Sequence, residues 1–391
     1  MIDQGQTIYL DYAASTPVDP RVVEAMSAYM TADGNYANPS STHAEGRRAV
    51  AAIDKAAEQL ASLLNTGPHR LIWTSGATES DNLAIIGAAH HRRNRGRHLI
   101  SMRTEHKAVT DAFAALQKEG FEITWLEPGG DGVLDIAALE SALRDDTQLV
   151  SIMHVNNETG VIQDIERIGE LCRSRDVVFH VDAAQSVGKL PIDLDSLPVD
   201  LMSMTAHKVY GPKGIGALYI ADRPGVQVEP LLFGGGQQRS LRPGTQPTQQ
   251  IVGFGKTAEI AQQSMASDAE HLKGLRERLW SGISDVAGVV LNGSHEQGFP
   301  GILNVSIEDV EGESLLLALE PLCVATGSAC NSKSKEPSYV LRAIGRSDEL
   351  AQSAVRFSFG RPSTRDEVDI AIQKYRDAVQ CLRAIAPGAA A

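Results

Sequence analysis

Cysteine is scarce in this chain of 391 residues, with thiols only at positions 172, 323, 330 and 381. So few cysteines cannot form a disulfide framework, which excludes the small, disulfide-stabilised class of secreted proteins. No two of them form a C-x-x-C pair, which argues against a zinc site, and we expect no resident metal. The chain is expected to be reduced and cytoplasmic, with thiols that are mostly buried.

Long apolar runs and an excess of basic charge are also missing. No stretch approaches the roughly 20 apolar residues that a membrane helix needs, and residues 1–6 do not resemble the start of a signal peptide. Lys and Arg total 36 against 49 Asp and Glu, so the formal net charge is -13. Because an acidic surface repels phosphate backbones, we expect neither nucleic acid nor a membrane as a partner.

Two phosphate-binding signatures are absent as well. The chain contains neither G-x-x-x-x-G-K-[ST] nor G-x-G-x-x-G, which argues against nucleoside triphosphates and dinucleotides as ligands.

Short apolar runs alternate with amphipathic segments through the middle of the chain. Runs with the length of buried strands lie at 71–74, 98–102, 149–153, 177–181, 201–204 and 215–220, and helical patterns lie at 107–119, 136–143 and 165–175. This alternation predicts an α/β fold in which a mainly parallel sheet lies between helices. Such sheets bind their ligands beyond the carboxyl ends of the strands.

Beyond about residue 260 the pattern changes. A long helical pattern at 260–284 is followed by short strands at 301–307 and 355–359 and by a closing helix at 364–385. We therefore expect a large domain at 16–260 and a smaller α+β domain formed by residues 1–15 together with 261–391.

Three features at predicted strand ends carry the chemistry. The run at 71–75 is followed by small residues at 76–78 that begin a helix. The backbone N–H groups at such a helix start favour a phosphate, although an ordinary capped turn has the same pattern. Asp182 ends one buried strand, and Lys208 follows another. A buried carboxylate needs a cationic partner, and a desolvated lysine is a Schiff-base nucleophile. A phosphate site, a carboxylate for a pyridinium nitrogen and a lysine for an aldehyde predict pyridoxal phosphate.

Other polar residues follow strands of the same predicted sheet. The amides in 156–160 could contact a ring hydroxyl or a substrate carboxylate, and His106 could stack on a flat ring. A single histidine is more often structural, but the positions of His106 and His207 after strands favour a role in the site. Lys213 is expected to be a surface or loop residue.

One cysteine differs from the others in its surroundings. Cys330 lies among small and polar residues at 325–335, which predicts an exposed loop with a reactive thiol. Cys323 follows an apolar run and is expected in the core, whereas Cys172 and Cys381 lie in helical patterns and are expected to be structural.

Taken together, these segments resemble the cysteine desulfurases of the NifS/IscS type, which are class V aminotransferase-like pyridoxal phosphate enzymes of fold type I. The resemblance extends from residue 9 to about 387. The segments that carry it are 34–41, 76–80, 154–160, 182–185, 206–214, 327–330 and 355–358. It implies a fold-type-I transferase fold whose large domain binds the cofactor and whose small domain carries the catalytic Cys330 loop.

The resemblance also implies roles for single residues. Lys208 would hold the cofactor and move protons, Asp182 would pair with its ring nitrogen, and His106 would stack on its ring. Gln185 would face the ring hydroxyl, and Asn157 would contact cofactor and substrate. The residues implied for the phosphate are Ala77, Thr78, Thr205, His207 and, reaching the phosphate in the other copy of a homodimer, Thr245.

The implied reaction removes sulfur from L-cysteine, leaving L-alanine and a persulfide on Cys330. Arg356 would bind the cysteine carboxylate bidentately. The persulfide would pass to acceptor proteins such as an iron–sulfur scaffold, where Cys330 could transiently contact a cluster, or to a tRNA thiolation relay. Assembly systems dedicated to nitrogenase use similar sulfur donors, so the sequence leaves the acceptor open, as it does any selenocysteine activity.

Other functional classes remain open, and one segment departs from the family pattern. A class V aminotransferase or a selenocysteine lyase would share the cofactor site without needing Cys330, and a non-catalytic sulfur-carrying scaffold would need neither Lys208 nor Asp182. The run at 237–240 departs from the family's usual His-Glu-Arg-Gly-like pattern, which puts local details near the subunit interface in doubt.

Overall fold

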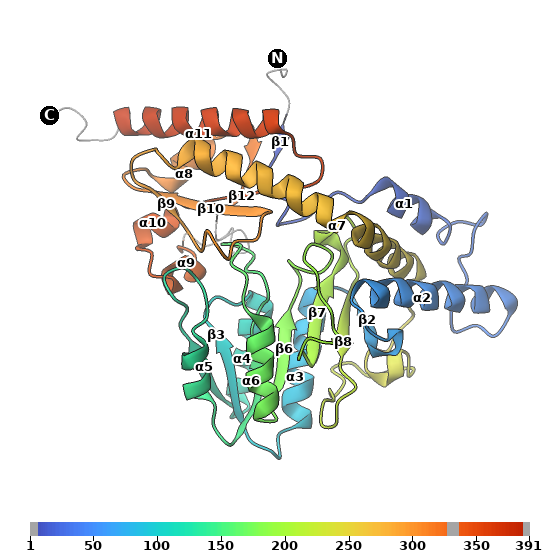
Figure 1. The fold of residues 1–391 in the computed structure, drawn as a ribbon. Coiled ribbons are helices and arrows are strands. Elements are labelled where there is room, and N and C mark those ends of the chain that lie inside the picture. Colours follow the sequence, from blue (N-terminus) through green and yellow to red (C-terminus); the bar gives the residue numbers. More distant parts are fainter. Residues whose placement is uncertain (1–6, 327–335, 386–391) are drawn as a thin grey trace.

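A seven-stranded sheet forms the centre of the larger body in a computed structural model that describes residues 7–326 and 336–385 (Figure 1). Its strands are, in spatial order, β2 (Leu71–Thr74), β8 (Gly216–Ile220), β7 (Leu201–Thr205), β6 (Val178–Asp182), β5 (Thr147–Ser151), β3 (His98–Met102) and β4 (Glu122–Leu126). In this sheet β8 runs antiparallel to both neighbours, and the remaining pairs are parallel. The predicted mainly parallel sheet is confirmed.

Helices cover both faces of this sheet. Figure 1 shows α6 (Ile165–Ser174) in front of it and α3 (Ala77–His91) behind it. Successive strand residues point to opposite faces, so Leu99 belongs to the core that includes α3 and α4 (Lys107–Lys118), whereas Ile100 belongs to the core that includes α2 (Ala44–Leu63), α5 (Ile136–Ala142) and α6. Both faces are therefore buried, as the unbroken apolar strands require.

A smaller body packs around a second core. Its antiparallel sheet has the order β12 (Val355–Ser358), β10 (Ile302–Ile307) and β9 (Val289–Leu291), and β1 (Ile8–Tyr9) pairs in parallel with β11 (Leu322–Cys323). Ile8 and Leu10 share this core with α11 (Arg365–Ile385) and the second half of α7 (Thr248–Ile283). The helices that complete the described chain are α1 (Pro20–Ser27), α8 (Gly312–Ala318), α9 (Tyr339–Ala343) and α10 (Asp348–Gln352).

Helix α7 begins twelve residues before the helical pattern expected from residue 260. Gly253 and Gly255 obscure that pattern in the sequence, and the structure shows why glycine is needed. A Cβ on Gly255 would lie 2.5 Å from the Cα of Ala56, so α7 and α2 touch backbone to backbone. The helix runs through the expected boundary at 260 and extends along both bodies (Figure 1), and the division into 16–260 and 1–15 plus 261–391 stays a prediction.

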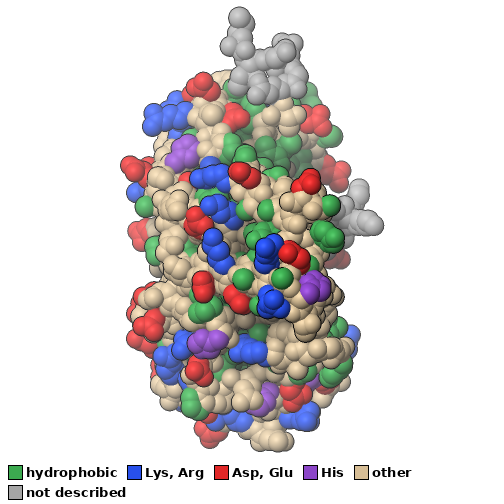
Figure 2. Space-filling view, turned by 90° about the vertical axis from the view of Figure 1, so that its right-hand side faces the viewer, with side chains coloured by type: hydrophobic (Ala, Val, Ile, Leu, Met, Phe, Trp, Pro, Cys, Tyr) green, Lys and Arg blue, Asp and Glu red, His purple; other side chains and the backbone are tan. Residues whose placement is uncertain are grey.

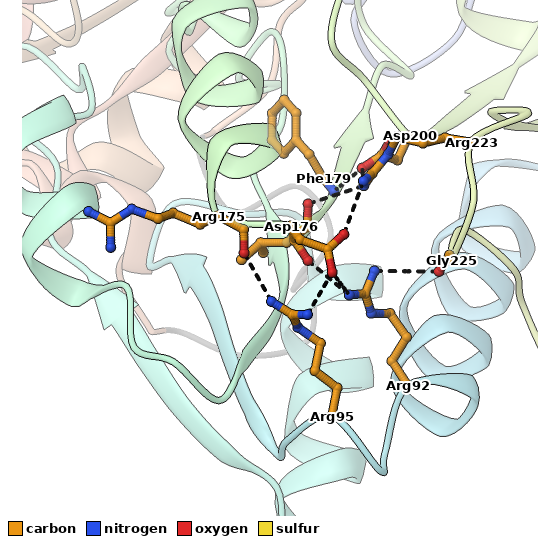
Figure 3. A network of polar contacts seen from close by, with 9 residues as sticks. Arg92, Arg95, Arg175, Asp176, Phe179, Asp200, Arg223 and Gly225 are labelled. Atoms are coloured by element: carbon orange, nitrogen blue, oxygen red, sulfur yellow. Dashed lines mark hydrogen bonds and ion pairs between the residues drawn. The ribbon is translucent and has the colours of Figure 1, made fainter.

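A charged network closes the amino-terminal edge of the large sheet (Figure 3). Asp176, just before β6, accepts from Arg92 at 3.0 Å and from Arg95 at 2.6 Å. Arg223, which follows β8, joins Asp176 to Asp200 through contacts of 3.3 and 2.7 Å. These residues lie at the edge opposite to the one where ligands are expected.

The molecular surface carries both signs of charge. Acidic and basic side chains are interspersed on the face drawn in Figure 2. In the two described ranges, no helix has the length and apolarity required to span a bilayer.

Candidate active site

A cavity of about 560 Å³ opens at the carboxyl ends of the parallel strands. Among the residues that line it are Ala77, Thr78, His106, Asn157, Asp182, Gln185, Thr205, His207, Lys208 and Arg356. All but Arg356 end or follow one of five strands of the large sheet (β2, β3, β5, β6 and β7), and the shared direction of these strands brings them together. Of the other predicted site residues, Thr245 is exposed and does not line the cavity, and Cys330 lies outside the described residues.

One end of the cavity is built for a small anion. Helix α3 starts at Ala77, where the first backbone N–H groups of a helix have no partner within the helix. The backbone approaches closely here, because a Cβ on Gly216 would lie 2.6 Å from the Cα of Gly76. The carboxylate of Glu79 accepts hydrogen bonds from Ser75 N at 2.7 Å and from Arg242 Nε at 2.9 Å, so its negative charge is paired. This cradle fits a phosphate group.

His207 also lines this end. Burial lowers its pKa to about 4, helped by the positive charges of Lys208, Lys213 and Lys189. The imidazole is therefore neutral at pH 7 and offers an N–H without adding charge. Lys213 is exposed, as predicted, and lines the cavity near Gly214.

Asp182 ends β6 with its carboxyl group almost fully enclosed. Its Oδ1 accepts from the backbone N–H of Ala184 at 2.9 Å. Burial raises its pKa, which the charges of His106 and Lys208 oppose. A buried carboxylate open to a cavity fits a cationic ring nitrogen, which would replace the lost hydration.

Two further buried carboxyl groups lie near Asp182 and were not predicted. Burial raises the pKa of Asp81 and of Glu105 well above the usual range, and the charge of Asp182 adds to both shifts. Both side chains therefore favour the protonated form more strongly than exposed carboxyl groups do. Asp81 lies on the buried face of α3, 3.6 Å from Nε2 of His180, and only the three-dimensional structure brings them together.

Lys208 lies on the short 3-10 turn Ala206–Lys208 that follows β7. Its Nζ donates to the backbone carbonyls of Ala13 at 2.6 Å and Ala14 at 2.9 Å. Gln185 also donates to the Ala13 carbonyl, at 2.8 Å. The N-terminal segment thus supplies acceptors that hold both side chains at the cavity.

His106 caps the amino end of α4. Its Nδ1 accepts from the backbone N–H of Ala108 at 3.1 Å, so the proton of the neutral ring lies on Nε2. This bond fixes the ring at the cavity wall, and an imidazole ring has the flat shape that stacking requires.

Arg356 brings β12 of the smaller body to the cavity. It is only 4% exposed and donates to Asn157 O and to Asp11 Oδ1, both at 2.7 Å. Its Nε has no acceptor among the described residues. A buried guanidinium with a spare N–H suits a substrate carboxylate.

Glu158 lines the cavity beside Arg356, although only its neighbour Asn157 was predicted. Ser338 donates to its Oε2 at 2.5 Å. Burial raises the pKa of Glu158 to about 7, against the opposing effects of Ser338, Arg356 and His106. The polar run at 156–160 pointed to this place, but its partner Ser338 lies 180 positions away in sequence.

The remaining cysteines differ in burial. Cys172 is buried in the core, which confirms its structural role, and burial raises the pKa of its thiol. Cys323 is partly buried on β11. The expectation for Cys381 is wrong, because it lies on the solvent side of the amphipathic helix α11 and is exposed. Within the described ranges, no three His, Cys, Asp or Glu residues are grouped so that they could hold a metal ion.

Comparisons with known proteins agree with this geometry. The family model described as Aminotransferase class-V matches residues 8–370. Proteins named Cysteine desulfurase IscS from Cronobacter sakazakii and Escherichia coli are each 56% identical over 97% of this chain and 94% of the relative.

Solved structures are similar as well. A NifS-like protein superposes with a TM-score of 0.89 at 36% identity, covering 96% of this chain and 100% of the other. A structure described as SspA in complex with cysteine has a TM-score of 0.81 at 39% identity and covers 92% of this chain and 100% of the other. DndA from Streptomyces lividans has a TM-score of 0.77 at 40% identity, with 90% and 99% covered.

Proposed function

The chain belongs to the class V aminotransferase family and, within it, to the cysteine desulfurases, and on this premise we propose that it transfers sulfur from L-cysteine to Cys330 and releases L-alanine. The observation that carries the proposal is the convergence of Lys208, Asp182 and Arg356 on one cavity with a phosphate cradle at its end. Pyridoxal phosphate needs the first two groups and the cradle, and an amino-acid carboxylate needs the third.

The cofactor fits the residues that line the cavity. The start of α3 with Ala77, Thr78, Thr205 and His207 would hold its phosphate, and Asp182 would pair with its ring nitrogen. His106 would stack on its ring, and Gln185 would face its hydroxyl. When bound, pyridoxal phosphate delocalises the electron pair that is left when the substrate loses its α-proton.

Lys208 would hold the cofactor through Nζ and take the α-proton at the same atom. Its two carbonyl acceptors, Ala13 and Ala14, keep Nζ at the cavity when it is not bonded to the cofactor.

Arg356 would bind the substrate carboxylate, with Asn157 beside it. The backbone carbonyl of Asn157 and the carboxylate of Asp11 hold the guanidinium in place before substrate arrives. Such preorganisation would bind the substrate carboxylate in one orientation.

Cys330 would attack the substrate sulfur as a thiolate, so that an S–S bond forms while the Cβ–S bond breaks. The described chain reaches the cavity on both sides of residues 327–335. Ala325 pairs with Arg356 through two backbone hydrogen bonds of 2.7 and 3.2 Å, and Ser338 donates to Glu158. Both Arg356 and Glu158 line the cavity, which supports access of the segment between these anchors to the substrate.

We propose further that the chain works as a cytoplasmic homodimer with the domain division 16–260 and 1–15 plus 261–391. Phe233, which is 88% exposed, and Leu232, which is 52% exposed, precede Thr245 in an apolar and glycine-rich stretch. A second copy covering these side chains would bring Thr245 to the other phosphate site. The acceptors that we propose are iron–sulfur scaffold proteins and tRNA thiolation relays.

The test is sulfide and alanine release from L-cysteine by purified protein in a reducing thiol, with Cys330→Ala beside the wild type. We expect the variant to lose sulfide release while it keeps the yellow colour of the bound cofactor. Full activity without Cys330 would favour a lyase or transaminase, and a colourless wild-type protein would favour a sulfur-carrying scaffold.

A further inference from the structure

A second lysine lies behind the cofactor site, and the proposed reaction gives it no role. Lys189 follows β6 by a short turn, and its amine end is enclosed. The turn depends on Gly188, which has φ +73° and where a Cβ would lie 2.6 Å from Cγ2 of Val209. Gly188 therefore packs closely against Val209, the neighbour of Lys208 in the sequence.

The two lysines are joined by a chain of hydrogen bonds. Lys189 Nζ donates to Gln185 Oε1 at 3.0 Å, and Gln185 Nε2 donates to Ala13 O at 2.8 Å. Lys208 Nζ donates to the same Ala13 carbonyl at 2.6 Å. The amide of Gln185 thus has a donor at its oxygen and an acceptor at its nitrogen, which leaves it one orientation.

Lys189 has no carboxylate partner in the described parts of the chain. Besides Gln185, its Nζ contacts the ring of Phe299, 5.6 Å from the ring centre. Burial, together with the positive charges of Lys208 and Arg356, lowers its pKa to about 7. An enclosed amine without an ion pair destabilises the folded state. If position 189 served only to fill space, an apolar side chain of the same length would therefore be more stable there.

A small cavity of about 30 Å³ lies between these groups, lined by Ala13, Gln185, Lys189 and Lys208 among others. It is large enough for a water molecule. A water molecule there could compete for hydrogen bonds with the Gln185 amide. The bond from Lys189 to Oε1 would keep the amide in its orientation despite this competition.

We propose that Lys189 is a positioning residue for the cofactor, because it holds Gln185 with Nε2 toward the oxygen substituent of the bound ring. The inference rests on the proposed role of Gln185 at that oxygen. A second N–H of Nε2 remains for the ring after the bond to Ala13 O. The charged and the neutral amine can both donate to Oε1, so this positioning holds on both sides of neutrality.

The test compares full-length holoenzyme with Lys189→Met, Lys189→Arg and, as a control, Lys256→Met, dialysed against graded pyridoxal phosphate. Lys256 is a partly buried lysine on α7 that pairs with Glu259 at 2.9 Å. We expect the dissociation constant to rise about tenfold in Lys189→Met, as for one hydrogen bond to a charged group. Lys189→Arg should restore most of the affinity, and Lys256→Met should match the wild type.

A spectrum separates positioning from a merely structural role. Without the Gln185 donor at the ring oxygen, the pH midpoint of the cofactor's absorbance change should rise in Lys189→Met. The melting temperature of the cofactor-free variant should equal or exceed that of the wild type. In a Gln185→Ala background the additional loss from Lys189→Met should be less than about twofold, since both act through one contact.

Wild-type affinity and an unchanged midpoint in Lys189→Met would overturn the proposal, as would additive losses in the double variant. A lowered melting temperature with an unchanged midpoint would also overturn it, in favour of a structural role. None of these measurements requires sulfur transfer. A wild-type protein that binds the cofactor but releases no sulfide would therefore defeat the proposed function and leave this inference intact.

Discussion

Glu158 should make the stability of the protein fall as pH rises toward neutrality. Its carboxyl group has a pKa of about 7 in the folded chain against an ordinary value of 4.5. The folded state therefore binds more protons than the unfolded state between these two values, so the free energy of unfolding decreases with pH across that window. A shift of this size corresponds to about 3 kcal/mol.

Glu158→Gln removes the titration but keeps an oxygen that can accept from Ser338. We therefore expect the free energy of unfolding of the variant, relative to wild type, to increase by up to about 3 kcal/mol between pH 4.5 and 7 and to stay level above that. Urea unfolding at fixed protein concentration and several pH values measures this difference. Glu296→Gln, at an exposed glutamate, is the matched control and should give a difference that does not change with pH.

A pH-independent difference for Glu158→Gln would refute the reasoning, because it would mean that burial does not hold a proton on this carboxyl group. A difference that grows with pH in Glu296→Gln as well would assign the effect to overall charge.

Three further changes test other parts of the structure. Arg356→Lys loses the two-pronged donor of a buried guanidinium, so kcat/KM for L-cysteine should fall about 10- to 100-fold, whereas Arg278→Lys, in a half-exposed pair with Asp369, should leave it unchanged. Gly216→Ala places a Cβ 2.6 Å from Gly76 and should weaken cofactor retention on dialysis, whereas Gly274→Ala, with open space around its Cβ, should retain the cofactor fully. Asp176→Asn weakens the ion pairs of a half-exposed carboxylate, so urea unfolding should show a loss of no more than about 1 kcal/mol. Unchanged kcat/KM, unchanged retention or a loss of several kcal/mol, respectively, would contradict these expectations.

The strand-end positions of the site could be predicted because they depend on local patterns. Asp182 and Lys208 each follow an apolar run, and parallel strands bring such positions to one edge whatever their order in the sheet. The same patterns gave the extents of the central strands to within a few residues.

The side chains that could not be predicted depend on distant partners. Glu158 is recognisable only beside Ser338, and Lys189 only beside Phe299 and Gln185, whose amide in turn bonds the distant Ala13 carbonyl. The start of α7 before residue 260 was not predicted for a related reason. The glycines that permit its contact with α2 resemble helix breakers in the sequence.

The bond between Arg356 and Asp11 spans 345 positions of the chain and completes the pocket that we propose for the substrate carboxylate. During synthesis, Lys208 and Asp182 leave the ribosome long before Arg356, so the central sheet and its anion cradle can form while the carboxylate pocket does not yet exist. A growing chain could therefore bind the cofactor before it can bind an amino acid. On this reasoning, the reaction can begin only after β12, which carries Arg356, has packed against the N-terminal segment that contains Asp11.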